Sequence, residues 1–161
     1  MSERSWPADL NNLRREYGRF RDPSARYPTK AQKSVKRAAR PGNDLEHLAR
    51  VRQLWCTLGH ERGLKIDVHH LQGGPARKFR GLGLKSPDAW VVPLEHWRHM
   101  ELHALGSRHE LDYFMENGGI NPYVLATALF AISKMGVVTM GRVLTAHQLQ
   151  GSKVLLERKR P

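Results

Sequence analysis

The sequence has little cysteine and no long apolar segment. Its one cysteine, Cys56, excludes a framework of internal disulfides, and this scarcity is typical of proteins from reducing compartments. No apolar run approaches the roughly 18 residues needed to span a bilayer, and the first twenty residues hold no apolar segment of the secretory type. We therefore expect a cytoplasmic protein with no membrane partner.

Acidic residues are also scarce. The 161 residues include 15 Asp and Glu against 27 Lys and Arg, so the formal net charge is +12 with histidine neutral. This charge says nothing about the fold, but it predicts attraction to polyanions, with nucleic acid as the first candidate. Acidic proteins stay open as partners, because some basic proteins bind them.

The first 42 residues have few of the large aliphatic side chains that build a core. They contain eleven Lys and Arg, four acidic residues and four prolines that interrupt any long helix. We expect residues 1–42 to form a basic, largely irregular arm, in which residues 31–40 become helical on a partner. Four cations of this segment are candidate phosphate contacts, namely Lys33, Lys36, Arg37 and Arg40.

From residue 43 the pattern changes to that of a folded domain of the α+β class. Leucines at helical spacing follow the cap candidates Asn43 and Asp44. Two apolar runs predict strands over residues 64–71 and 89–94. Pro93 would end the second strand and lie in the first turn of a helix over residues 94–105.

Two further helices follow. Ser107 and Glu110 match a capping box at the start of the first helix, and Gly118 and Gly119 would end it. The second begins with Pro122 after its cap residue. We assign residues 43–134 to one domain. Residues 135–161 form a C-terminal extension of unknown role, for which a short helix or two short strands both fit.

Histidines are concentrated in one part of the chain, since five of the nine lie between residues 69 and 103. His99 and His103 are four residues apart on the expected helix and share a face, as in other two-histidine metal sites. His69 and His70 are neighbours on the expected strand, so they point to opposite faces. One could complete a metal site while the other acts as a general base whose tautomer Asp88 holds.

The connection between the two expected strands is rich in glycine and in cations. Its cations are Arg77, Lys78, Arg80 and Lys85. Glycines permit close approach of the backbone and the cations supply charge, so this segment is a candidate phosphate-contacting loop. A mobile, solvated loop remains the alternative. Phe79 could stack on a base or anchor the loop.

The order of strand, loop, strand and helix with these histidines resembles the HNH, or ββα-metal, nuclease superfamily. The matching segments are residues 68–70, residues 88–94 and residues 99–103. The nuclease colicins have a similar adjacent-histidine opening and the same HxxxH ending. The resemblance implies that His69, His99 and His103 hold one divalent ion and that His70 is the general base. The asparagine that names the motif is absent, and Asp88 is nearest to its place. The implied fold is a small ββα-metal core with surrounding helices.

A closer resemblance covers about residues 43–133 and is to the phage recombination-enhancement (Ref-like) nucleases. The run HHLQGG…GLGLKSPDAWVVPLEHWRHMELHALG…INP carries it. This family implies metal-dependent cleavage of DNA, with a recombinase filament as a possible partner, in a bacterial or phage-infected cell. Members commonly carry a structural zinc knuckle, of which only Cys56 remains here, so no structural zinc is expected.

The sequence therefore predicts a metal-dependent endonuclease that hydrolyses phosphodiester bonds in DNA, single- or double-stranded, in phage or mobile-element recombination or DNA processing. The ion is Mg²⁺, Mn²⁺ or Zn²⁺. A catalytically silent subunit that binds nucleic acid, or serves in assembly, and retains the HNH fold is the main alternative. RNA as the substrate, and a role as a basic partner of a recombinase, also stay open.

Overall fold

The computed structural model describes residues 42–59, 65–79 and 85–158, and within these residues the fold is mixed α+β. The expected basic arm, with Lys33, Lys36, Arg37 and Arg40, lies outside the described residues except for its last residue, and so does Arg80. No helix among the described residues combines the length and the apolar character that a bilayer span requires.

A β-hairpin forms the centre of the fold. Strand β1 (Ile66–His70) pairs in antiparallel fashion with β2 (Val91–Glu95), and their register places His69 opposite Val92 and His70 opposite Val91. All five residues of β2 are buried, because helices cover the hairpin on more than one side. The connection contains a short 3₁₀ helix, η1 (Gly74–Phe79), anchored by the buried Ala76. Both expected strands are confirmed to within two residues in the described part of the chain.

Pro93 does not end the second strand, and that prediction is wrong. The strand continues to Glu95, and the helix begins only at His96. The Pro93 carbonyl accepts hydrogen bonds of 2.9 Å from both the backbone N–H and the hydroxyl of Thr57, so it points away from β1. In a strand, the nitrogen and the carbonyl of one residue face the same side. The missing N–H of proline therefore costs no bond between β1 and β2.

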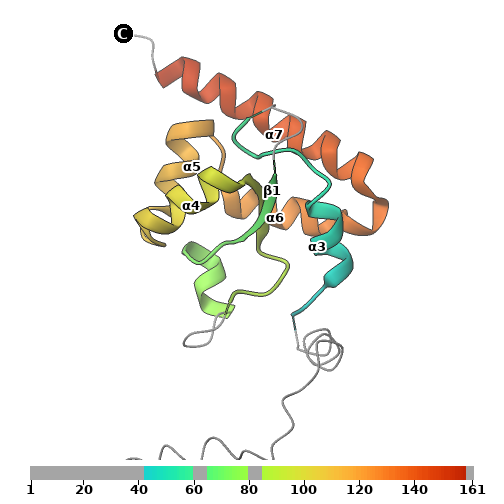
Figure 1. Cartoon of the computed structure of the whole chain (residues 1–161). Coiled ribbons are helices and arrows are strands. Elements are labelled where there is room, and N and C mark those ends of the chain that lie inside the picture. Colours follow the sequence, from blue (N-terminus) through green and yellow to red (C-terminus); the bar gives the residue numbers. More distant parts are fainter. Residues whose placement is uncertain (1–41, 60–64, 80–84, 159–161) are drawn as a thin grey trace, which may run out of the picture. The chain divides into compact units, whose positions relative to one another are not determined.

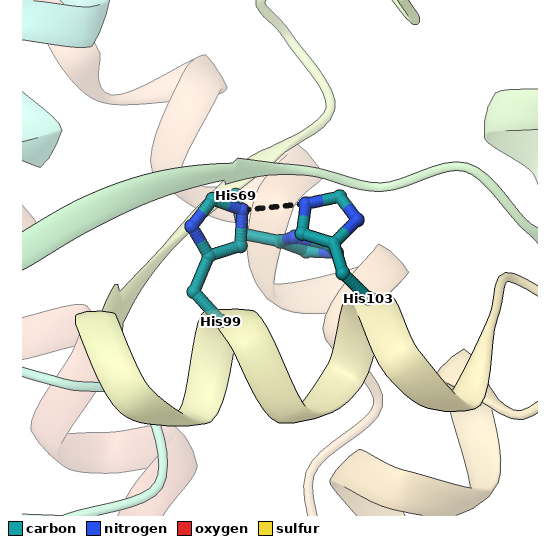
Figure 2. A group of neighbouring side chains, drawn as sticks. All are labelled: His69, His99 and His103. Carbon is teal, nitrogen blue, oxygen red and sulfur yellow. Dashed lines mark hydrogen bonds between the residues drawn. The ribbon is translucent and has the colours of Figure 1, made fainter.

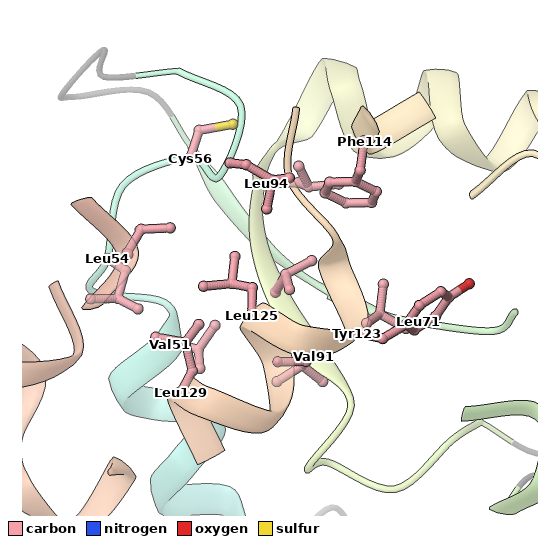
Figure 3. Close-up of a cluster of buried hydrophobic side chains, with 14 of the residues drawn as sticks. Val51, Leu54, Cys56, Leu71, Val91, Leu94, Phe114, Tyr123, Leu125 and Leu129 are labelled. Atoms are coloured by element: carbon pink, nitrogen blue, oxygen red, sulfur yellow. The ribbon is translucent and has the colours of Figure 1, made fainter. Parts of the chain in front are cut away.

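Five helical segments and η2 pack around the hairpin (Figure 1). Helix α4 (His96–Leu105) lies against both strands, and α3 (Leu45–Val51) and α6 (Pro122–Ala131) pack against β2. Helix α5 (Glu110–Gly118) contacts α4, while η2 (Ser133–Met135) joins α6 to the last helix. Figure 3 shows the buried side chains that fill the space between them, among them Val51, Leu71, Leu94, Phe114, Leu125 and Leu129.

The capping box predicted at the start of α5 does not form. The N-cap residue is His109, which makes no side-chain cap bond, and Glu110 is only 1% exposed. The predicted end of the helix is confirmed, because Gly119 caps it in the left-handed conformation with φ 62°. The start of α6 is also confirmed, with the Asn121 side chain accepting from two backbone N–H groups.

Within the expected C-terminal extension, residues 137–158 form one long helix, α7 (Val137–Arg158, 22 residues), rather than a short helix or two strands. Its glycines serve packing: a Cβ on Gly151 would overlap the Gly118 carbonyl oxygen, and a Cβ on Gly141 would lie 2.9 Å from the Trp55 ring. The buried Gln148 amide donates to the carbonyls of residues 56, 57 and 59 over 2.9–3.2 Å. Helix α7 is thus joined to the segment that leads toward β1.

Replacing Gly151 by alanine tests this packing. Because the new Cβ would meet backbone atoms of the α5 C-terminus, α5 and α7 must move apart, and we expect the free energy of unfolding to fall by about 1–3 kcal/mol. Urea denaturation followed by circular dichroism measures it. The exposed neighbour Gln150→Ala is the control and should change stability by less than about 0.5 kcal/mol. Equal stability of both variants would contradict the close contact.

Candidate metal centre

Three histidines converge where β1 meets α4. His69 comes from the strand, and His99 and His103 come from successive turns of the helix (Figure 2). One ring nitrogen of each lies within 4.8 Å of the others, and the Nε2 atoms of His99 and His103 are 2.9 Å apart. His69 is buried and His103 is exposed, so the cluster is accessible from one side. The structure brings together the three residues predicted as metal ligands, and the cluster could hold a metal ion.

His69 is oriented by a buried carboxylate, that of Glu110. Its Nε2 lies 3.0 Å from Glu110 Oε1. An ionised carboxylate can only accept hydrogen bonds, so Nε2 carries the proton and Nδ1 carries the lone pair. Nδ1 is buried and has no hydrogen-bond partner among the residues that the structure describes. A buried acceptor without a partner costs free energy unless something binds it. The chemistry of this atom therefore fits a metal ligand with a carboxylate behind it.

The protonation states agree with this interpretation. Burial disfavours the charged form of Glu110, yet hydrogen bonds from His69 and from two backbone N–H groups hold the pKa of its carboxyl below the usual value. Burial also lowers the pKa of His69, an effect that the bond to Glu110 only partly opposes. The carboxylate is thus ionised and the imidazole neutral at neutral pH, which is the state that binds metals.

The double glycine after the two histidines lets the chain pass close to this carboxylate. The backbone N–H groups of Gln72 and Gly73 donate to Glu110 over 2.9 Å, and Tyr123 Oη donates over 3.0 Å. A Cβ on Gly73 would lie 2.5 Å from Tyr123 Oη and 2.9 Å from the Ser107 carbonyl oxygen. Gly74 has φ +47°, a conformation that favours glycine. The glycines therefore belong to the support of the histidine cluster.

A second carboxylate orients His99. Asp67 Oδ2 lies 3.1 Å from His99 Nδ1 and 2.6 Å from His96 Nδ1. The bond to Asp67 places the His99 proton on Nδ1. Its Nε2, the atom that faces His103, then keeps the lone pair that can coordinate an ion. Although burial opposes it, hydrogen bonds from His96 and His99 lower the pKa of Asp67. The exposed His96 is thereby turned to Asp67 rather than to the cluster.

Sequence reasoning missed both of these carboxylates. Asp67 lies two residues before His69 and so shares its face of the strand, a signal that strand periodicity supplies. Glu110 carried a misleading signal, because its spacing from Ser107 matches a capping box. Its real partners, Gln72 and Gly73, lie 37–38 residues away in the sequence. Only the packing of α5 beside the hairpin brings them together.

The predicted catalytic pair consists of His70, which follows His69 on β1, and Asp88, which lies shortly before β2. His70 Nε2 is 2.8 Å from Asp88 Oδ1, so the structure joins the two residues as expected. The side chains of His70 and Asp88 are 10% and 6% exposed. Asp88 Oδ2 also accepts the Asp44 N–H over 2.8 Å, and the Asp88 N–H donates to the Gly42 carbonyl. The pair therefore also ties the start of α3 to the hairpin.

The described cations of the connecting segment are on the surface. Arg77 and Lys78 are exposed in the last turn of η1, and Lys85 is exposed before β2. Lys85 lies near enough to the cluster to lower the pKa of His103, after burial and the His99 charge. Cys56 is fully buried, and its Sγ accepts the Glu95 N–H over 3.5 Å.

Metal binding to the three histidines should raise stability. Free Zn²⁺ at about 100 times its dissociation constant is expected to add about 2.7 kcal/mol to the free energy of unfolding, because it binds only the folded chain tightly. Thermal melting with and without the ion measures this gain. His103→Ala removes one exposed ligand and should abolish most of it, whereas the exposed His109→Ala should keep it. An equal gain in both variants would contradict the site.

Glu110→Gln tests the carboxylate behind His69. A neutral amide has one acceptor oxygen for the four donors that Glu110 accepts, so His69 loses its fixed tautomer. We expect Zn²⁺ affinity, measured by calorimetric titration, to fall about 10- to 100-fold. Glu116→Gln, an exposed change on the same helix, is the control. Tyr123→Phe removes only one donor and should cause a smaller loss. Unchanged affinity in Glu110→Gln would refute the role of this carboxylate.

No family model, curated protein or solved structure matches this chain. Its function must therefore be inferred from its own geometry. That geometry combines three convergent imidazoles and two carboxylates that orient two of them. It also includes the His70–Asp88 pair, whose histidine is the next residue of the strand.

Proposed function

We propose that this chain is a metal-dependent endonuclease of the HNH, or ββα-metal, type that hydrolyses phosphodiester bonds in DNA. The supporting observation is the convergence of His69 from β1 with His99 and His103 from α4, directly after a two-stranded hairpin. The resemblance to the HNH superfamily implies this ligand set. The resemblance to the Ref-like nucleases implies a bacterial or phage-infected cell, with a recombinase filament as a possible partner.

Three imidazole nitrogens would hold the ion. Because all three donors are nitrogens and no carboxylate oxygen of the described residues joins them, the set favours Zn²⁺ over Mg²⁺ and Mn²⁺, which prefer oxygen ligands. A bound divalent ion would supply stabilisation of charge on the phosphate and on the leaving oxygen. The exposed side of His103 and a small open pocket lined by Gln72, Ser107 and Glu110 give the substrate access to this side of the cluster.

His70 is the candidate general base. Asp88 accepts at His70 Nε2, so the proton resides there and the lone pair resides on Nδ1. Taking a proton from water would make the ring positively charged, and the adjacent Asp88 carboxylate stabilises that charge. Asp88 thus fixes the tautomer of His70 and stabilises the positive charge on its ring, without itself touching the substrate.

Surface cations would supply affinity that does not depend on base sequence. Arg77, Lys78 and Lys85 are exposed near the hairpin, and the whole chain carries a formal charge of +12. Contacts of this kind go to phosphate oxygens and weaken steeply with salt. Charge alone does not distinguish DNA from RNA, so both belong in the assay.

A second candidate function is that of a catalytically silent subunit that binds nucleic acid or serves in assembly. The observation that favours it is the burial of the His70–Asp88 pair, which also braces α3 through Asp44 and Gly42. In that case the ion would only stabilise the contact between β1 and α4. Binding would then persist without any cleavage.

Cleavage assays decide between the two. Wild-type protein is incubated with supercoiled DNA, single-stranded DNA and RNA under chelator, Mg²⁺, Mn²⁺ or Zn²⁺. We expect cleavage only with metal, and a rate at least 100-fold lower for His70→Gln, which keeps a donor for Asp88 but is no base. His109→Ala should cleave normally. If no substrate is cut while wild type and His70→Gln bind equally, the silent-subunit function replaces the nuclease.

A further inference from the structure

An exposed aromatic side chain lies at the end of η1. Phe79 is 62% exposed, and its ring stacks on Trp90 with centroids 6.0 Å apart and an interplanar angle of 22°. Trp90 is partly buried and packs against the core. The inner face of the Phe79 ring is therefore supported, while most of the ring remains in water. Exposure of so large an apolar surface is unfavourable for the free protein.

The surroundings of this ring are cationic. Arg77 and Lys78 are exposed on the same turn, immediately before Phe79. A flat ring beside cations is the combination with which proteins bind single nucleic acid strands, since the cations contact phosphates and the ring stacks on a base. An acidic protein surface would complement the charge but would leave the flat ring without a matching partner.

The backbone of Trp90 lies next to the segment that carries the candidate catalytic pair. Trp90 follows Asp88 by two residues and precedes Val91, the register partner of His70. Its carbonyl accepts the Leu71 N–H over 2.9 Å, directly across the hairpin from the residue after His70. The supporting ring of the platform is thus anchored, through its backbone, to the residue after His70.

We propose that Phe79, supported by Trp90, is a stacking platform for an unpaired nucleobase, with Arg77 and Lys78 contacting the flanking phosphates. This inference rests on the proposed function only in taking nucleic acid as the ligand, and it does not require cleavage. Paired bases in an intact duplex have both faces covered by their neighbours. The platform therefore favours single strands, or bases already unpaired, over intact duplex.

The test compares Phe79→Ala with Phe79→Tyr, which keeps the ring. Affinity for a labelled oligothymidine and for a duplex of equal length is measured by fluorescence anisotropy at fixed salt with chelator present. Phe79→Ala should weaken single-strand binding about 5- to 150-fold, the worth of one base stack, and duplex binding less than 2-fold. Phe79→Tyr should match wild type. Lys78→Ala should weaken the binding of both ligands similarly.

A second readout reports stacking itself. A single strand with one 2-aminopurine should lose fluorescence on binding wild type and Phe79→Tyr, but not Phe79→Ala. The platform is overturned if wild type binds no single strand or if Phe79→Ala keeps its affinity. It is also overturned if Phe79→Ala weakens the binding of single strand and duplex equally, as the loss of a loop anchor would. If Phe79→Ala loses affinity for the single strand alone and wild type cleaves no substrate, the platform is supported and the nuclease is refuted. If wild type cleaves DNA and Phe79→Ala shows no such selective loss, the nuclease is supported and the platform is refuted.

Discussion

The hydrogen bond between Glu110 and His69 is the interaction on which the rest of the site depends. Both side chains are buried, so the carboxylate must be satisfied by donors, and it accepts from a histidine, two backbone N–H groups and a phenol. These bonds join α5, the end of β1 and α6. They also leave His69 Nδ1, a buried acceptor without a partner in the described part of the chain, as the ring nitrogen that can coordinate an ion.

Imidazoles pair with carboxylates repeatedly around the hairpin. His69 bonds to Glu110 and His70 bonds to Asp88. Asp67 bonds to both His96 and His99. Each bond fixes a ring proton and thereby decides which nitrogen keeps a lone pair. A histidine that merely fills space in a core does not require such a partner. The repeated pairing therefore supports a chemical role for the cluster more strongly than the presence of the histidines alone.

Local periodicity explains what the sequence could predict. Four-residue spacing placed His99 and His103 on one face of α4, and strand alternation sent His69 and His70 to different partners. Long-range packing explains what it could not. Glu110 matched a local capping rule but bonds across 41 residues to His69. Pro93 reads as a strand end until its carbonyl partner Thr57 is known.

The most direct measurement of the central claim is the protonation and metal-binding pattern of His69 by long-range ¹H–¹⁵N NMR on imidazole-labelled protein. We predict that His69 carries its proton on Nε2 before and after Zn²⁺ is added, and that only its Nδ1 resonance shifts on coordination. Coordination through Nε2, or no shift of His69 while His99 and His103 respond, would contradict it.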